Sequence, residues 1–210
     1  MKFMNAAILV VATLLATVAH AETYQLGKHY KEVQAKTLPR NPGKVEVVEA
    51  FWYGCGHCNH FEPLVQAWKK DLPNDVNFYQ VPAQFSRQWK IHAELFYLTK
   101  VLKVNDKVHE AIFDSIHKQR EPLFSESDQQ EFLAQYGVSE EDFDKYNDSF
   151  MVRRHLKMGD EQIRTWGISG VPAMIVQGKY IVDATSAGGQ HKILDVVDYL
   201  VEKERKLMMQ

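Results

Sequence analysis

Short apolar runs and helical stripes alternate along this chain. Residues 45–53 form a run rich in β-branched and aromatic residues, and residues 76–81 form a second, so each predicts a buried strand. Between them a stripe at helical spacing predicts a helix from about Cys55 to Asp71. That stripe consists of Phe61, Leu64, Val65 and Trp68. A strand, a helix and a strand make the smallest parallel crossover unit.

From Gln88 to about Thr165 the pattern is helical throughout. Two stripes carry it: Ile91, Leu95, Leu98 and Leu102, then Val108, Ala111, Ile112 and Ile116. Ser127 with Gln130 matches a capping box, and Ser139 precedes an acidic turn, so each predicts a helix start. A segment of this length is too long for a loop in a compact domain, so we expect a helical subdomain with its own core.

Strand patterns return after the helical segment. Residues 173–176 and 180–182 predict two strands joined by a turn at Gln177-Gly178, and an amphipathic helix is expected from Ile193 to Lys206. Because sheet elements lie on both sides of the helices and no linker rich in Gly and Ser separates them, the helices are predicted to be an insertion. We expect an α/β fold with a discontinuous domain, 22–86 and 164–210, and an inserted helical subdomain, 87–163.

The first residues are predicted to be a signal peptide, 1–21, and are excluded from the fold. Lys2 precedes an apolar run from Ala6 to Ala19, which is followed by the small-x-small pattern that ends at Ala21. The run is shorter than the ~20 residues that span a bilayer, so a permanent anchor is the weaker interpretation. Cleavage after Ala21 would leave an exported protein in a compartment where disulfides persist.

Composition excludes several classes of protein. The chain has 210 residues, of which 45% are hydrophobic and 25% charged, which is typical of a globular protein and not of a disordered chain or a coiled coil. A formal net charge of −2 provides no basic surface for a phosphate backbone, so nucleic acid is not an expected partner.

The only two cysteines, Cys55 and Cys58, are three residues apart. A disulfide between them would close a ring too small to constrain the whole fold, so structural stapling is a poor explanation. On a helix this spacing puts the Cα atoms about 5 Å apart, within the range that a disulfide requires. The pair can therefore alternate between dithiol and disulfide with little backbone movement, Cys55 as the exposed reactive sulfur and Cys58 as the buried resolving one.

The position of Cys55 at a strand-to-helix junction favours its thiolate. A pKa lowered from ~8.5 to ~3.5–7 requires about 2–7 kcal/mol, and a helix terminus supplies at most ~2, so another group must contribute. The residues between the cysteines are Gly56 and His57, and the imidazole is the expected source. A stabilised thiolate makes the disulfide more oxidising, which favours an oxidase over a reductase.

A metal site and a haem attachment site are the alternative interpretations of the cysteine pair. A closed zinc site needs four ligands, and without a second cysteine pair His57 and His60 would have to complete it, so no resident metal is expected. Haem attachment requires His directly after Cys58, where the chain has Asn59. Glu49, inside the first apolar strand, is either paired, or surface-facing at the edge of a sheet, or a proton acceptor with a raised pKa for Cys58.

The chain resembles the DsbA-type periplasmic thiol:disulfide oxidoreductases, within the thioredoxin-fold superfamily. The resemblance covers the chain after residue 21, and its most specific segments are 51–58 (FWYGCGHC), 170–173 (GVPA), 178–180 (GKY) and 24–30 (YQLGKHY). It implies a thioredoxin-like fold with an inserted helical subdomain, a cis Val171–Pro172 bond facing the disulfide, and Cys55 as the nucleophile. It also implies a groove for unfolded exported proteins with free cysteines and reoxidation by a quinone-coupled membrane protein of the DsbB type. We expect a periplasmic monomer with no cofactor beyond the Cys55–Cys58 disulfide.

Two departures from the family pattern bear on the function. Gly56 stands where Pro is usual, as in eukaryotic protein disulfide isomerases, so we expect a milder oxidant. Gln80 aligns where the family often has a lysine beside the buried glutamate, so Glu49 is expected to be tuned differently. An isomerase or reductase on the same scaffold, and a chaperone that holds a metal ion at the cysteines, are the competing hypotheses. A separate dimerisation region, typical of isomerases, has little room before the first strand.

Overall fold

The computed structural model describes residues 24–209, so the predicted signal peptide lies outside the described residues. A five-stranded mixed sheet has the order β1-β5-β4-β2-β3. Its strands are β1 (Lys31–Glu32), β2 (Val45–Phe51), β3 (Val76–Pro82), β4 (Ala173–Val176) and β5 (Tyr180–Asp183). β2 pairs in parallel with β3 and antiparallel with β4. The four predicted strands are confirmed. β1 was not predicted, because a strand of two residues is too short to show an alternation of hydrophobic and polar positions.

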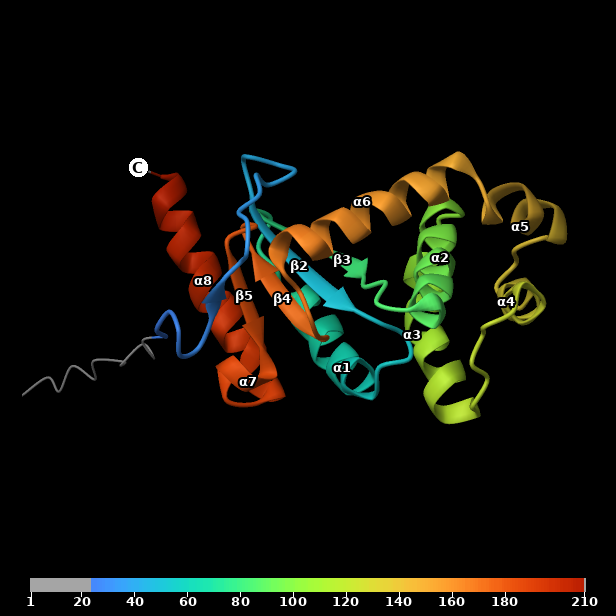
Figure 1. Ribbon diagram of the computed structural model, residues 1–210, viewed down its shortest axis with the longest axis horizontal. Helices are drawn as coiled ribbons and strands as arrows, with labels where there is room; N and C mark the ends of the chain where they lie inside the picture. Colours follow the sequence, from blue (N-terminus) through green and yellow to red (C-terminus); the bar gives the residue numbers. More distant parts are fainter. Residues whose placement is uncertain (1–23, 210) are drawn as a thin grey trace, which may run out of the picture.

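Helices cover both faces of this sheet (Figure 1). α1 (Gly56–Lys70) and α8 (Ile193–Met208) bury one face, where Val47, Phe61 and Val197 share a core. The end of α6 (Phe150–Trp166) lies on the other face, where Val48, Ile163 and Trp166 share a second core. Alternate residues of β2 serve the two cores, as expected of a strand that is buried on both sides. The predicted α/β fold class is confirmed.

The remaining helices form the other half of the molecule in Figure 1. They are α2 (Arg87–Val101), α3 (Asn105–Asp114), the π-helical turn η1 (Ser115–Gln119), α4 (Glu126–Ala134) and α5 (Glu140–Asn147). After β5 come the short helices α7 (Ala184–Ala187) and η2 (Gln190–Lys192). The helices α2 to α5, the helical half of the molecule, share a core that includes Phe51, Tyr53 and Cys58, which precede the helical segment in the sequence. The segment around the cysteines therefore belongs to the core of the helical half. The boundaries of the two predicted domains stay a prediction.

Two local predictions were wrong. α4 begins after Ser125, whose hydroxyl accepts from the N–H of Asp128, so Ser127 lies inside the helix and does not cap it. Leu64, expected in the buried stripe of α1, is 42% exposed, whereas Glu62 is 3% exposed. The cap of α5 is at Ser139, where the sequence predicted it.

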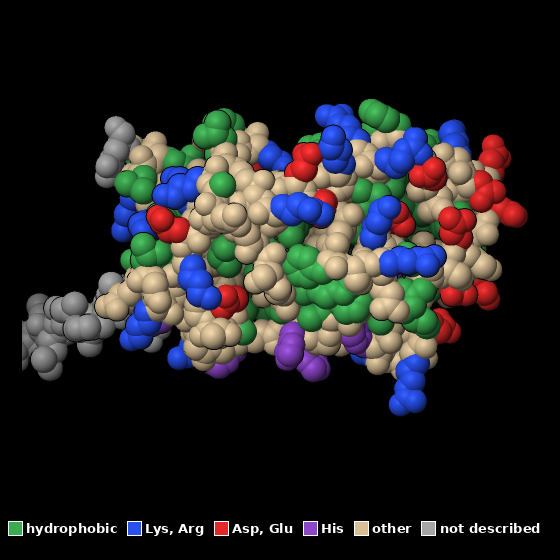
Figure 2. All heavy atoms as spheres, viewed as in Figure 1, with side chains coloured by type: hydrophobic (Ala, Val, Ile, Leu, Met, Phe, Trp, Pro, Cys, Tyr) green, Lys and Arg blue, Asp and Glu red, His purple; other side chains and the backbone are tan. Residues whose placement is uncertain are grey.

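None of the helices within residues 24–209 is long and apolar enough to cross a membrane. Acidic side chains gather over the end of the molecule that carries α4 and α5, and apolar side chains gather near the middle of the same face (Figure 2). The middle of this face is where the sheet half meets the helical half.

Candidate active site

β2 leads into the cysteine pair at the junction of the two halves. Cys55 is the N-cap of α1, with extended backbone angles, and its sulfur accepts a hydrogen bond from the N–H of Cys58 at 3.3 Å. Both cysteines are free thiols, with Cys55 half-buried and Cys58 1% exposed. The predicted contrast between an accessible outer sulfur and a buried inner one is confirmed.

The surroundings separate the acidities of the two thiols. The hydrogen bond from the Cys58 thiol lowers the pKa of Cys55 to about 6, although burial of the sulfur opposes this effect. The N–H groups of Cys58 and His57 and the charge of the imidazole add to the lowering. Burial, with the nearby sulfur and the charge of Glu49, raises the pKa of Cys58 far above its ordinary value. Near neutral pH the pair therefore holds one proton, and Cys58 carries it.

Gly56 and His57 are both exposed on the first turn of α1. His57 lowers the pKa of Cys55 through its backbone N–H and its charge, but the Cys58 thiol contributes more than either. The sequence pointed to the imidazole as the main addition to the helix terminus, and the structure instead gives first place to the second cysteine. A side chain at residue 56 would extend into open space, because nothing lies within 4 Å of the Cβ position.

A cis peptide bond joins Val171 and Pro172, as expected. The carbonyl oxygen of Val171 lies 3.6 Å from the sulfur of Cys55 and accepts the thiol hydrogen when Cys55 is protonated. The loop that precedes β4 therefore meets the N-terminus of α1 at the reactive atom.

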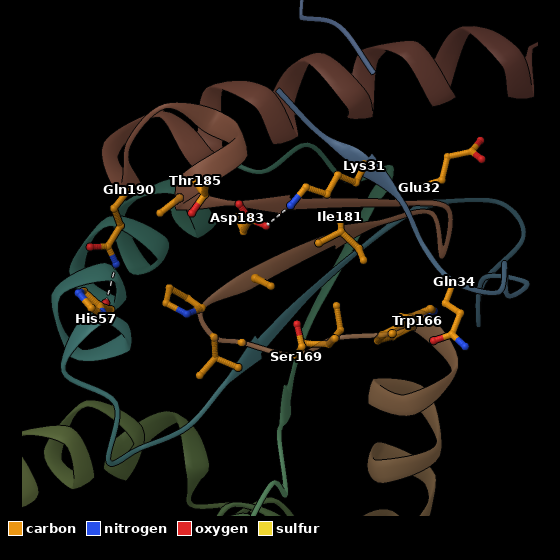
Figure 3. Close-up of a pocket in the computed structure, with 17 residues that line it drawn as sticks. Lys31, Glu32, Gln34, His57, Trp166, Ser169, Ile181, Asp183, Thr185 and Gln190 are labelled. Carbon is orange, nitrogen blue, oxygen red and sulfur yellow. Dashed lines mark hydrogen bonds and ion pairs between the residues drawn. The ribbon is translucent and has the colours of Figure 1, made fainter. Parts of the chain in front are cut away.

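A pocket of about 730 Å³ opens beside this contact. His57, Val171 and Pro172 line it together with Trp166, Ile181 and Gln190. At its margins Gln190 donates to the carbonyl of His57 at 2.5 Å, and Lys31 pairs with Asp183 at 3.2 Å (Figure 3). Its volume lies in the range of protein ligand sites.

Glu49 is 1% exposed and lies beneath the cysteines in β2, between β3 and β4. The interpretation of Glu49 as a surface group at the sheet edge is therefore wrong. One carboxylate oxygen accepts from Gln80 at 2.8 Å, and the other has no hydrogen-bond partner among the described residues. Burial first, and then the charge of Glu62, raise the pKa of Glu49 well above its ordinary value.

Three functional candidates were missed by sequence reasoning: Tyr53, Glu62 and His109. Glu62 follows Cys58 by four residues, so a charged residue on the buried face of α1 was the available signal. His109 had no such signal in the sequence, because only the packing of α3 against α1 brings it beside Glu62. Within the described part of the chain, no group of three or more metal-binding side chains converges.

Comparisons with known proteins agree with this geometry. A profile of the family described as "DSBA-like thioredoxin domain" matches residues 54–194. A "Thiol:disulfide interchange protein DsbA" from Azotobacter vinelandii is 43% identical over 209 residues, which is 97% of this chain and 98% of that protein. A protein of the same name from Pseudomonas aeruginosa is 40% identical over 95% of this chain and 94% of its own.

Solved structures give the same result. The crystal structure of Pseudomonas aeruginosa DsbA superposes with a TM-score of 0.84 at 39% identity, covering 89% of this chain and 97% of that one. For the oxidoreductase DsbA from Xylella fastidiosa the TM-score is 0.80 at 32% identity, over 86% and 97%. With the profile and the relatives spanning most of its length, the chain belongs to the DsbA-like thioredoxin domain family.

Proposed function

We propose that this chain is a thiol:disulfide oxidase that donates the Cys55–Cys58 disulfide to exported proteins. The observation that carries this proposal is the placement of the two sulfurs: that of Cys55 accepts hydrogen bonds from Cys58 at the start of α1, which lowers its pKa to about 6, whereas burial raises the pKa of Cys58. A stabilised thiolate favours the reduced protein, so its disulfide is a strong electron acceptor. The relatives named as thiol:disulfide interchange proteins support the same reaction class.

The reaction follows from the accessibility of the two sulfurs. A substrate thiolate attacks the sulfur of Cys55, forms a mixed disulfide and displaces Cys58, which takes up a proton. A second substrate thiolate then attacks the substrate sulfur of that mixed disulfide and forms the substrate disulfide, and Cys55 leaves as a thiolate. The low pKa of Cys55 makes it a good leaving group, so this second step is fast.

Glu49 is the proposed proton donor and acceptor for Cys58. Its carboxyl group is buried, its pKa is raised, and its charge contributes to the raised pKa of Cys58. A carboxyl group with a raised pKa can give its proton to the departing Cys58 thiolate, and its conjugate base can remove that proton when the disulfide is formed again.

The pocket beside Val171 and Pro172 is the proposed binding site for an extended peptide of the substrate. Its lining is mixed, with Trp166 and Ile181 among the apolar residues and an ion pair at its margin. Backbone groups before Pro172 provide hydrogen bonds that do not depend on substrate sequence. This suits an enzyme that meets many partly folded proteins with free cysteines.

The cellular setting is part of the proposal. The pattern of residues 1–21 supports export to the periplasm with cleavage after Ala21, and the resemblance supports a monomer that a DsbB-type membrane oxidase recycles. The Gly56-His57 dipeptide favours a potential between those of oxidases and isomerases. No cofactor beyond the disulfide is required.

Trapping experiments test this function. Cys58→Ser should accumulate mixed disulfides with reduced substrate proteins, because the resolving sulfur is absent, whereas Cys55→Ser should form none and should not turn over. The reduction potential against glutathione, and refolding of a scrambled multi-disulfide substrate, separate an oxidase from an isomerase. A potential as reducing as that of a cytosolic thioredoxin would overturn the proposal.

A further inference from the structure

Beneath the cysteines lies a buried polar cluster that sulfur exchange alone does not use. We call Tyr53, Glu49, Glu62, Gln80 and His109 the buried network. The side-chain nitrogen of Gln80 lies 2.8 Å from Glu49 Oε2 and 3.3 Å from Glu62 Oε2. Nε2 of His109 lies 3.3 Å from Glu62 Oε1, and both of these side chains are about 95% buried. The cluster joins β2, α1 and β3 to α3 of the helical half.

Gln80 links the two carboxyl groups. Its amide nitrogen lies between these two carboxylate oxygens and also 3.0 Å from Nε2 of His109, so its two hydrogens have three polar atoms around them. Two buried carboxylates that share one neutral donor repel each other when both are charged, so they lose their protons at different pH values. The proton that the pair retains must lie on one of them, and the group beside each carboxyl decides which.

His109 stands beside only one of the two. Its hydrogen bond and charge, with help from Gln66 and Gln80, outweigh the effect of burial and lower the pKa of Glu62. Glu49 has no such partner, and the charge of Glu62 adds to burial in raising its pKa. Carboxyl groups whose environments drive their pKa values apart are typical of acid–base sites.

Tyr53 contacts the other ring nitrogen of His109. The tyrosine oxygen lies 2.8 Å from Nδ1 of His109. A hydroxyl donates to a neutral imidazole and accepts from an imidazolium, so this bond exists in both protonation states. Burial, with the charge of Glu62, raises the pKa of Tyr53, so the hydroxyl keeps its own proton.

A small cavity connects the network to the surface. It has a volume of about 40 Å³, which is enough for water, and Gln80 and His109 line its inner wall. The charged groups at its mouth are Lys69 of α1 and Asp106 and Glu110 of α3, all exposed. Besides Glu62 and Tyr53, His109 has the uncharged side chain of Gln80 3.0 Å from Nε2 and the rings of Phe51, Phe96 and Phe113 around it, none of which carries a charge.

We propose that His109 is a positioning residue for proton transfer between Glu49 and Cys58: by pairing with Glu62, it assigns the shared proton to Glu49. The inference rests on the proposed oxidase function and deepens it. When the disulfide re-forms, the Cys58 proton passes to the Glu49 carboxylate and the Cys58 thiolate attacks Cys55. The Cys55–Cys58 bond forms, the bond from Cys55 to the bound thiol breaks, and that thiol leaves as a thiolate. Glu49 then releases its proton to water in the cavity.

The test isolates this step. The reduced protein without the predicted signal peptide is mixed with oxidised glutathione, which forms a mixed disulfide on Cys55. Stopped-flow fluorescence then measures the rate at which glutathione leaves this mixed disulfide, over a range of pH. In the wild type this rate rises with pH as Glu49 ionises. In His109→Gln, Glu62 loses its partner and takes the shared proton, so its charge no longer raises the pKa of Glu49. The rise in rate should then move toward acid pH by about one unit, which is a tenfold change in rate at a pH where the rate is still rising.

Companion variants make the result decisive. Glu62→Gln removes the same repulsion and should shift the profile in the same direction, and the double variant should shift it no further than either single one. His155→Gln, on α6 against Tyr97, is the matched control and should not shift it. If His109→Gln and Glu62→Gln both keep the wild-type profile, the proposal is overturned. If the wild type forms no glutathione mixed disulfide, the proposed function fails instead.

Discussion

Cys55 has two roles that depend on the same sulfur atom. As the N-cap of α1 it accepts the N–H of Cys58, and as the reactive atom it faces the carbonyl of Val171. An N-cap position favours an acceptor with negative charge, because the first N–H groups of a helix have no partner within the helix. The thiolate therefore both caps the helix and is the reactive group, and formation of the disulfide eliminates this negative charge.

His92 shows how a buried residue can make stability depend on pH. It is 1% exposed, its ring stacks on Phe124, and Nε2 lies 2.8 Å from the carbonyl of Pro122. Burial lowers its pKa to about 4 from 6.5. The unfolded chain thus binds a proton at higher pH than the folded one, so the folded protein loses up to about 3 kcal/mol of stability as the pH falls from 6.5 to 4.

Replacement of this histidine should remove that loss. His92→Phe keeps an aromatic ring against Phe124 but gives up the bond to Pro122, which costs about 1–3 kcal/mol at neutral pH. Its free energy of unfolding, measured by urea titration, should then fall less steeply than that of the wild type toward pH 4. His60→Gln, an exposed histidine on α1, should follow the wild-type curve. Parallel curves for His92→Phe and the wild type would refute the assignment.

At the scale of elements, the first turn of α1 is prepared for a proline. Cys55 has φ −86° and ψ 115°, which suits a residue before proline, and residue 56 is the first helical position, where proline is favoured. Gly56→Pro should therefore raise the free energy of unfolding by about 0.4–1 kcal/mol, because it restricts the unfolded chain. Guanidinium titration of the oxidised protein measures this gain.

A neighbouring glycine provides the matched control for that variant. A Cβ at Gly54 would lie 2.3 Å from the ring of Trp52, so Gly54→Ala should destabilise the protein. Equal effects of the two substitutions would contradict the difference between open space at residue 56 and close contact at residue 54.

The start of α4 gives another test at this scale. Ser125→Ala removes the side-chain acceptor for the N–H of Asp128 and should cost about 1 kcal/mol of stability. Ser127→Ala lies inside the helix and should change stability by no more than a few tenths of a kcal/mol, in either direction. Thermal unfolding distinguishes the two. A larger loss from Ser127→Ala would restore the capping box that the sequence pattern predicted.

These elements show what the sequence could predict. β4 has the predicted bounds, and β2 begins where predicted but ends at Phe51, two residues before the apolar run does. The cysteine pair was identified from spacing and from its place after β2. Local patterns of this kind depend on neighbours in the sequence.

Other features depend on contacts that no local pattern contains. Glu62 is buried because His109 of α3 pairs with it across the two halves of the molecule, and hydrophobic spacing instead predicted burial of Leu64. The place of Glu49 within the sheet required the pairing of β2 with both β3 and β4. Three of the five side chains of the buried network were therefore not identified before the fold was known.

At the scale of the whole molecule, the redox centre lies where the two halves meet. β2 runs toward the helical half in Figure 1, and Phe51, Tyr53 and Cys58 pack in the core of that half. The pocket and Pro172 instead belong to the sheet half. Oxidation or reduction of the cysteine pair therefore changes contacts in both halves, so the redox state should alter the stability of the entire fold.

The pH dependence of that effect has a definite sign. In the reduced protein the folded pKa of Cys55 is about 6, against 9.0 for an ordinary thiol, so its thiolate adds stability that is full above pH 9 and is lost as the pH falls to 6. The raised pKa of Cys58 acts only above pH 9, where its contribution falls. In the oxidised protein neither sulfur titrates.

The reduced form should therefore be more stable than the oxidised form, and the difference should grow from pH 6 to pH 9. Because Cys55 is only half-buried, solvent screening reduces the increase to about 2 kcal/mol, roughly half of the ideal conversion of its pKa shift. Paired guanidinium titrations of the two redox forms measure it. Glu49→Gln serves as the control, since it removes the other group that titrates beside the sulfurs and should leave the increase in place. A difference that stays constant or shrinks toward pH 9 would mean that the folded protein does not hold Cys55 as a thiolate.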